Sequence, residues 1–249
     1  MTLTKKKNKQ TIKGEKTMRL KPNIFFDMDG VIAVYEKDAY IPESGKKPLY
    51  LDLDKHYFRT CKKNEHAAKI LQMLRSLNAS DERMHDVKPF VNTLLKKSVG
   101  LDTPTHPSVK VSDYIFSASV HVLSRIPQSC KEAIVITEDK KKWLDEHFTN
   151  KNMTRREKGI CFNTSFKNKA ETAEHILSRP LRPTDILIDD YNPNLIEWER
   201  RGGTAIKYLN GQNDANSWEG LCVSSNETPA EIVSFIMMIL IQNKIADVY

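Results

Sequence analysis

Two acidic residues stand one residue apart in the stretch Ile24-Phe25-Phe26-Asp27-Met28-Asp29-Gly30, directly after an apolar run. Asp and Gly are common in turns, so a strand that ends at a polar turn would explain the pattern without any chemistry. Side chains alternate along a strand, however, so Asp27 and Asp29 would point to the same side and repel each other. The pair therefore predicts a compensating positive charge close by.

Other apolar runs of the chain also end at polar residues. The sequence predicts strands at 23–26, 114–116, 159–162, 185–188 and 204–208. It predicts helices at 130–148, 169–177 and 194–201. Strands and helices that alternate in this way are typical of a parallel sheet built from strand-helix-strand units. Polar groups stand at or just beyond the strand ends, namely Asp27, Asp29, Ser117, Lys167, Lys169, Asp189 and Asp190.

These polar groups are expected to converge, because ligands of open parallel sheets bind beyond the carboxyl ends of the strands. Four carboxylates in one crevice would repel strongly unless a cation lay among them, and an oxygen-rich site with few protein ligands suits Mg²⁺. A hydroxyl and an ammonium group would then bind further anionic oxygens, such as those of a phosphoryl group. The pattern thus predicts a magnesium site that handles a phosphorylated ligand.

In this order, Asp27-x-Asp29-Gly30-Val31, the strand-end Ser117, a lysine ahead of the fourth strand and Asp189-Asp190 resemble the four motifs of the haloacid dehalogenase-like (HAD) superfamily. The similarity spans about residues 22–210. It implies an α/β fold with a three-layer Rossmann-like core, a parallel sheet and a mainly helical cap inserted after the first strand. It also implies hydrolysis of a phosphomonoester through an aspartyl-phosphate.

The resemblance gives each acid a role. Asp27 would be the nucleophile, and Asp29 would be first the general acid and then the general base. Mg²⁺ would be held by the Asp27 carboxylate, the Asp29 backbone carbonyl and the Asp190 carboxylate, with Asp189 nearby or bound through water. A halide-releasing dehalogenase needs no such acid, so Asp29 favours phosphate chemistry.

The phosphate group would be bound by Ser117, Gly30 and one lysine. Lys169 is preferred because it precedes a helix-like Ala-Glu-Thr-Ala run, which is where the superfamily usually has this residue. Lys167 and Lys140 remain alternatives, although lysines in such clusters are commonly solvated.

A closer similarity is to the 5′(3′)-deoxyribonucleotidases, which dephosphorylate nucleoside monophosphates. It rests on the stretches Asp27 to Tyr35, Trp143 to Phe148 and Leu187 to Asp190. Tyr35 aligns with an aromatic residue of that family and would stack on a base. The chain departs from the family at Ser117-Ala118-Ser119, where T-S-P is usual, and in the added segment 78–110. Another small phosphomonoester or a polynucleotide end therefore remains open as the substrate.

The chain divides into four expected parts. Residues 1–21 form a basic tail, which has all of the formal net charge of +7 and is expected to be disordered. Residues 22–33 and 113–225 form the HAD-like core, and residues 34–112 form the cap and insertion. In residues 226–249, a capping box at Thr228 to Glu231 opens a helix packed on the core.

The tail leaves a second functional class open, because basic segments also bind nucleic acid. The chain would then be a non-catalytic nucleic-acid-binding module, whereas a merely solubilising tail would leave the enzyme reading unchanged. Four scattered cysteines without a C-x-x-C pair indicate a reducing cytoplasm and no zinc site. No apolar segment resembles a secretory signal or a membrane span, so a membrane partner is not expected.

Overall fold

A computed structural model describes residues 18–34, 56–76, 114–116, 118–126, 133–148, 160–165, 168–211 and 218–246. The predictions for Ser117, Tyr35, Lys167 and the 78–110 insertion fall outside these residues and stay predictions.

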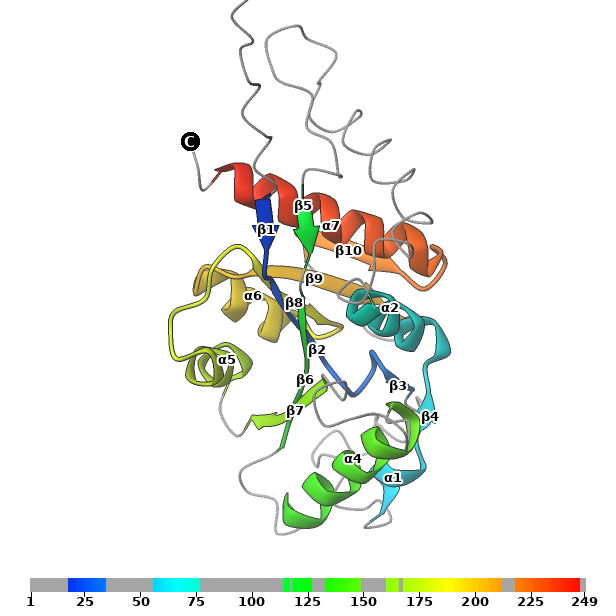
Figure 1. The fold of residues 1–249 in the computed structure, drawn as a ribbon. Helices are drawn as coiled ribbons and strands as arrows, with labels where there is room; N and C mark the ends of the chain where they lie inside the picture. Colours follow the sequence, from blue (N-terminus) through cyan, green and yellow to red (C-terminus); the bar gives the residue numbers. More distant parts are fainter. Residues whose placement is uncertain are drawn as a thin grey trace, which may run out of the picture.

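The centre of the fold is a six-stranded parallel sheet with the strand order β10-β9-β8-β2-β6-β7 (Figure 1). Its strands are β2 (Asn23–Phe26), β6 (Ser119–Arg125), β7 (Ile160–Ser165), β8 (Asp185–Asp189), β9 (Thr204–Leu209) and β10 (Leu221–Ser224). Two short pairs lie beside it, a parallel pair of β1 (Met18–Leu20) with β5 (Tyr114–Phe116) and an antiparallel pair of β3 (Ala33–Val34) with β4 (Lys62–Lys63). The predicted α/β class with a parallel, Rossmann-like sheet is confirmed at this level.

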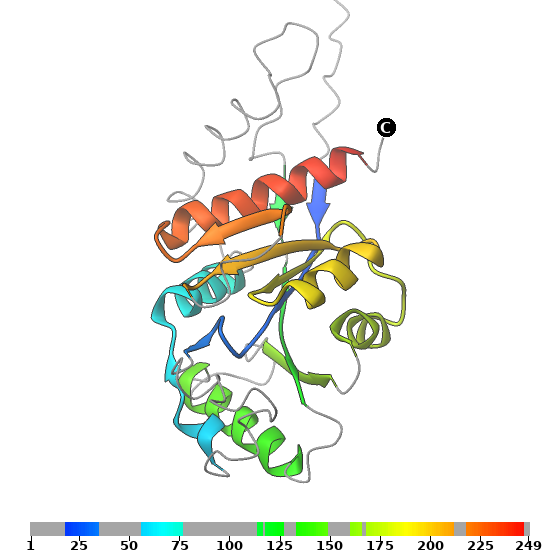
Figure 2. The same ribbon diagram turned by 180° about the vertical axis from the view of Figure 1, so that it is seen from behind.

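The helices lie on both faces of the sheet and make three layers (Figures 1 and 2). One face is covered by α2 (Glu65–Ser76), α4 (Ala133–Phe148) and α7 (Pro229–Ala246), and the other by α5 (Lys169–Leu177) and α6 (Asn192–Arg200). A short helix, α1 (Tyr57–Thr60), lies against α4. The strand order explains why α5 and α6 lie opposite α4. From β2 the chain moves through β6 to β7 in one direction, and then it returns to β8 on the other side of β2. Because crossovers between parallel strands are right-handed, the reversal of direction puts α5 and α6 on the opposite face from α4.

The apolar core explains why the strands read as short apolar runs. Ile24 and Phe26 of β2 point into the cluster under α2, α4 and α7, whereas Phe25 points into the cluster under α5 and α6. The same alternation holds in β8, where Leu187 faces away from Ile186 and Ile188. Both faces of a central parallel strand are buried, so its side chains are apolar on both.

Two segments of the chain differ from the sequence-based expectation. Met18–Leu20 forms β1 in a separate two-stranded pair with β5, so the disorder expected for residues 1–21 does not hold for these three residues. The basic character of the residues before them had hidden this short strand. The expected cap includes α2, and this helix packs in the main apolar cluster together with α7. For the rest of residues 34–112 the cap assignment stays a prediction.

The last helix starts where the sequence predicts. The Thr228 backbone N–H donates to Glu231 Oε2 at 2.8 Å, and the Glu231 N–H donates to Thr228 Oγ1 at 3.3 Å, which is the reciprocal pattern of a capping box. Its side chains from Ile232 to Ile241 are largely buried against the sheet. None of the helices in the described ranges combines the length and apolar character needed to cross a bilayer.

Candidate active site

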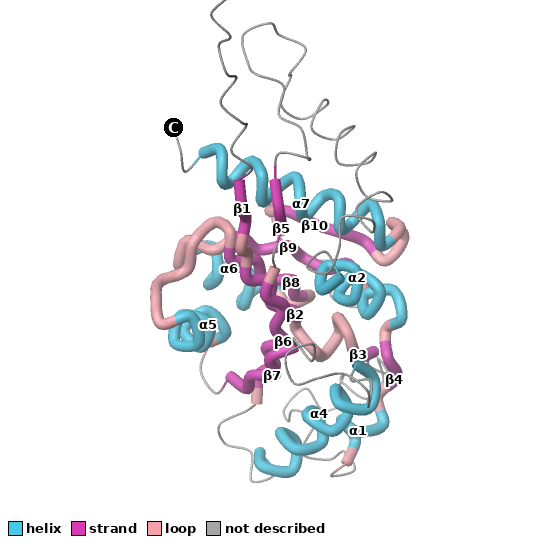
Figure 3. Tube along the Cα trace, in the orientation of Figure 1, coloured by secondary structure: helices cyan, strands magenta, loops and turns pink. Residues whose placement is uncertain are grey.

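The site begins in the loop that follows β2, at the carboxyl end of the sheet (Figure 3). The backbone of Asp27 still continues the hydrogen bonding between β2 and β8, because its N–H donates to the Ile188 carbonyl at 2.9 Å. The residue is 6% exposed, and its side chain accepts the Met28 N–H at 2.7 Å through Oδ1. Ile32 and Ala33 donate back to the Met28 carbonyl, which closes the loop tightly around Asp29 and Gly30. Two acids one residue apart are thus fixed at the strand end.

Gly30 is required by this loop for two separate reasons. Its φ of 82° lies in the left-handed region, which side chains with a Cβ rarely adopt. A Cβ at this position would also lie 2.3 Å from Asp190 Oδ2, closer than any real contact. The Gly30 carbonyl accepts the Asn210 amide at 2.7 Å, and the same amide donates to Asp190 Oδ2 at 3.0 Å. The glycine therefore brings the loop against Asp190.

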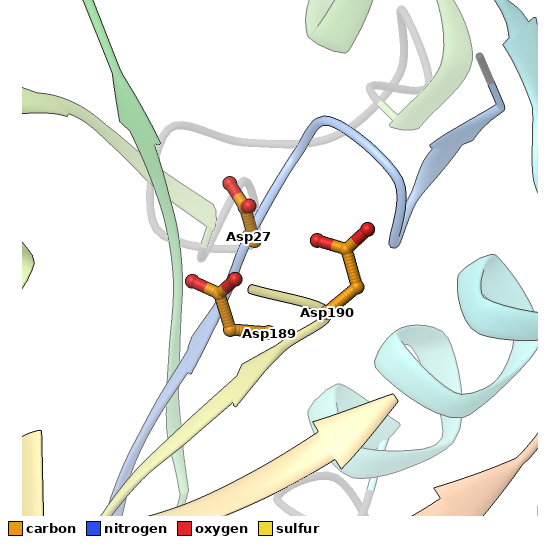
Figure 4. A group of neighbouring side chains, drawn as sticks. All are labelled: Asp27, Asp189 and Asp190. Atoms are coloured by element: carbon orange, nitrogen blue, oxygen red, sulfur yellow. The ribbon is translucent and has the colours of Figure 1, made fainter. Parts of the chain in front are cut away.

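Asp189 and Asp190 come from the carboxyl end of β8, next to β2 in the sheet. Figure 4 shows their carboxylates gathered with that of Asp27, and one oxygen from each lies within 4.8 Å of the others. Asp189, fully buried, accepts three hydrogen bonds, from the Tyr191 N–H, the Asn194 amide and the Lys169 ammonium. Asp190 reaches Asn210 across the crevice. The convergence predicted for these three acids is present in the structure.

Lys169 is the cation that neutralises part of this cluster. It is the first residue of α5, whose N-cap Asn168 accepts the Glu171 N–H, so the helix start fixes its position. Its Nζ lies 2.7 Å from Asp27 Oδ1 and 2.6 Å from Asp189 Oδ2. Burial alone would lower the pKa of Lys169, but Asp189 and Asp27 together raise it above its ordinary value, so the amine is charged.

A single ammonium does not balance three carboxylates. Burial, followed by the charge of Asp189, raises the pKa of Asp27 well above its ordinary value even with Lys169 beside it. The cluster therefore holds more negative charge than Lys169 alone compensates. A hard divalent cation would reverse this balance, and carboxylate oxygens are the ligands that Mg²⁺ prefers. The donor set therefore fits Mg²⁺, with Asp27 and Asp190 as direct ligands and Asp189 engaged mainly with protein donors.

Asp29 lies on the other side of the loop and faces β6. Its Oδ2 accepts hydrogen bonds from the Ser124 hydroxyl at 3.3 Å and from the Lys140 ammonium. Lys140 Nζ also donates to Ser124 Oγ at 2.9 Å and lies 4.3 Å from the centre of the Phe58 ring. Asp29 Oδ1 is buried and has no hydrogen-bond partner among the described residues. The positive charge that the acid pair predicted is thus supplied by two lysines, one for each acid.

The hydroxyl beside the acids belongs to Ser124, which the sequence analysis did not select. The strand next to β2 is β6, and its register pairs Phe26 with Val122, so its carboxyl end reaches the crevice at Ser124. The predicted strand 114–116 is β5, which precedes the amino end of β6 and pairs only with β1. The strand predicted at 114–116 is thus present, but it is not the strand that pairs with β2 among the described residues, and the role of Ser117 stays a prediction. The run Val120-His-Val-Leu-Ser124 carries the same apolar-then-serine signal as the one chosen.

Lys140 was the least favoured of the three lysines in the sequence, yet its side chain is only 1% exposed and contacts Asp29. Its neighbours Lys141 and Lys142 are exposed. Helical spacing was the signal that could have separated them, because Ile136, Lys140, Trp143 and Leu144 share the buried face of α4.

Comparisons of the chain with family models, with curated proteins and with solved structures gave no match.

Proposed function

We propose that this chain is a Mg²⁺-dependent phosphomonoester hydrolase that forms an aspartyl-phosphate on Asp27, as the resemblance to the HAD superfamily implies. One observation supports it above the others. Asp27, Asp189 and Asp190 gather within 4.8 Å beside a buried lysine, and Asp29, two residues beyond Asp27, has one buried oxygen without a hydrogen-bond partner among the described residues. Groups suited to act as nucleophile, cation ligands and proton donor therefore lie at adjacent strand ends.

In the first half of the reaction, the Asp27 carboxylate attacks phosphorus in line, and the bond between phosphorus and the ester oxygen breaks. Asp29 gives its proton to that oxygen, which leaves as an alcohol. Lys169 bonds to Asp27 Oδ1, which orients the nucleophile and brings positive charge toward the phosphoryl oxygens. Bound Mg²⁺ would supply the remaining positive charge against the carboxylates and the phosphoryl group.

In the second half, water attacks the phosphorus of the aspartyl-phosphate, and the bond between phosphorus and Asp27 breaks. Asp29, now a carboxylate, takes the proton of that water, and inorganic phosphate leaves. Both acids return to their starting states, so the cycle is balanced. The Ser124 hydroxyl, at the same strand-end level as the acids, donates to Asp29 Oδ2 and so would help to hold this acid during both steps.

A nucleoside monophosphate is the proposed substrate, on the strength of the closer resemblance to the 5′(3′)-deoxyribonucleotidases. Tyr35, the residue expected to stack on the base, follows directly after β3 and lies outside the described residues. Sugar phosphates and polynucleotide 3′ ends are the competing substrates, and nucleic-acid binding through the tail is the competing function.

The first prediction is that the full chain releases inorganic phosphate from nucleoside monophosphates in the presence of Mg²⁺, and stops when the metal is chelated. The measurement is a phosphate-release screen across nucleoside monophosphates, sugar phosphates and 3′-phosphorylated oligonucleotides. Preference for either of the other two substrate groups would move the substrate assignment and leave the reaction type. No phosphate release from any of them, together with oligonucleotide binding that requires residues 1–17, would favour the binding module.

A further inference from the structure

The acid Asp29 is held by a second buried lysine that the proposed reaction does not yet use. Lys140 comes from the middle of α4, far along the chain from the loop after β2, and its side chain is 1% exposed. Burying an ammonium group is costly unless it is paired and hydrogen-bonded. Here it meets the Asp29 carboxylate, the Ser124 hydroxyl and the face of the Phe58 ring.

The two carboxylate oxygens of Asp29 differ in their hydrogen bonds. Oδ2 accepts from both Lys140 and Ser124, whereas Oδ1 is buried and unpartnered among the described residues. A buried oxygen without a partner is uncommon in a native protein and points to a role outside the resting structure. Since Oδ2 is occupied as an acceptor, the proton that Asp29 transfers must travel on Oδ1.

From this difference we infer that Lys140 is a positioning residue for proton transfer: together with Ser124 it fixes Oδ2 and turns Oδ1 toward the ester oxygen of the substrate. The inference rests on the proposed function and assigns Lys140 no contact with phosphate. In the first step the Oδ1 proton passes to the leaving oxygen as the phosphorus–oxygen bond breaks. In the second step Oδ1 accepts a proton from the attacking water, and the Lys140 contacts stay in place throughout.

The helix α4 is built to hold Lys140 in this position. Trp143, Leu144 and Phe148 anchor it in the main apolar cluster, and the Trp143 indole N–H donates to the Cys61 carbonyl at 2.6 Å. At the residue before Lys140, Asp139 Oδ2 lies 3.0 Å from His56 Nδ1. The lysine therefore has a rigid base on two sides, which a positioning role requires.

The test uses the dependence of the rate on the leaving group. A nucleoside or alkyl alkoxide needs a proton to depart, whereas p-nitrophenolate and acetate leave without one, so only the first class depends on a well-placed acid. kcat/KM reports the steps up to departure of the leaving group. For Lys140→Met we expect kcat/KM to fall on the order of a hundredfold for a nucleoside monophosphate and to stay within about twofold for p-nitrophenyl phosphate and acetyl phosphate.

The second step gives an independent signal. Hydrolysis of the aspartyl-phosphate needs Asp29 as base with every substrate, so kcat for p-nitrophenyl phosphate should fall in Lys140→Met although kcat/KM does not. Rapid mixing should then show a burst of one p-nitrophenolate per active site followed by a slow steady rate. A structural role, or direct binding of phosphate by Lys140, would lower kcat/KM equally for all three substrates, and that result would overturn the inference.

Two further variants keep the test decisive. Lys142→Met changes an exposed residue of the same helix and should leave both kinetic constants unchanged. Removing Lys140 alone leaves a buried carboxylate without its cation, so Lys140→Met is also made in an Asp29→Asn background, where no charge is left unpaired. If Lys140 acts through Asp29, the double variant matches Asp29→Asn alone for every substrate, and a further loss would contradict the role. A wild-type chain inactive on all three substrates would instead refute the proposed function itself.

Discussion

The two lysines of the crevice hold two acids in different ways. On the β8 side, Lys169 bridges Asp27 and Asp189, and Asp189 accepts donors on both of its oxygens. On the β6 side, Lys140 and Ser124 bind one oxygen of Asp29, and the other oxygen is buried without a partner among the described residues. Lys169 thus compensates the charge of two acids, whereas Lys140 and Ser124 orient a single carboxylate. In the proposed reaction, the first ion pair would serve attack on phosphorus and the second would serve proton transfer.

The largest effect is expected from a change at Asp27, the proposed nucleophile, which contacts Lys169 on the β8 side. Asp27→Asn should lower phosphatase turnover by more than about a thousandfold, because the amide is a poor nucleophile and a poor metal ligand. The amide is nearly isosteric, so circular dichroism and the thermal midpoint should show a folded protein. Retained turnover in a folded variant would remove Asp27 from the reaction. Lys169 would then have no proposed role in positioning a nucleophile.

A smaller effect, on stability, is expected from a change in the loop after β2, where Gly30 lies against Asp190. Gly30→Ala should destabilise the fold by about 1–3 kcal/mol, since it places a Cβ both at positive φ and against Asp190. Gly211 is the matched control: its φ is also 82°, but a Cβ there would meet nothing within 4 Å. Gly211→Ala should therefore cost only the backbone strain, about 1 kcal/mol.

Urea unfolding of the two glycine variants measures this difference directly. We expect Gly30→Ala to lose both stability and phosphatase activity and Gly211→Ala to lose stability alone. Equal losses of stability would mean that the added Cβ fits against Asp190 at no energetic cost. The close approach of the loop to Asp190 would then not require a glycine at position 30.

The smallest effect is expected from a buried histidine that belongs to neither of the two lysine–acid contacts. His121 of β6 stacks on Phe25 at 4.5 Å between ring centres, and neither ring nitrogen has a hydrogen-bond partner among the described residues. Burial lowers its pKa below the ordinary 6.5, against a smaller opposing effect of Asp185. The unfolded chain therefore binds a proton more readily than the folded protein, so stability is lost as the pH falls through and below 6.5.

We expect the free energy of unfolding to fall with a slope of at most about 1.4 kcal/mol per pH unit from this group. Urea unfolding at pH 7.5 and pH 5.5 measures it, and His121→Phe should reduce the loss. His175 is exposed, and His175→Gln serves as the control that should change nothing. An unchanged loss in His121→Phe would show that other groups cause the acid sensitivity.

Local patterns in the sequence predicted the β8 side well. Both the acid pair after 23–26 and the pair after 185–188 stand directly at the end of short apolar runs, and the strands appear there. The predicted helix 169–177 coincides with α5, because an Asn cap and an apolar face mark it without help from the rest of the fold. These residues carry their own structural signal.

The β6 side depended on contacts distant in sequence. The stretch Tyr114 to Arg125 contains two apolar halves around Ser117-Ala118-Ser119, and no local rule decides which half pairs with β2. His121 and Ser124 made the second half look less like a core strand, although both are buried. Residue type likewise does not separate Lys140 from Lys141, and only helical spacing puts Lys140 on the buried face of α4 with Ile136 and Trp143.

The short β3–β4 ladder has a further meaning for how this protein can be altered. Val34 pairs with Lys62 and Ala33 with Lys63, so the two ends of the segment between β3 and β4 are held side by side. The Asn64 amide adds a second fastening, through its hydrogen bond to the Val31 carbonyl at 2.8 Å. Loop-closure entropy rises only by about 0.6 kcal/mol for each doubling of length. A segment of different length could therefore be placed between residues 34 and 56, provided that α1 is kept, without moving the loop after β2.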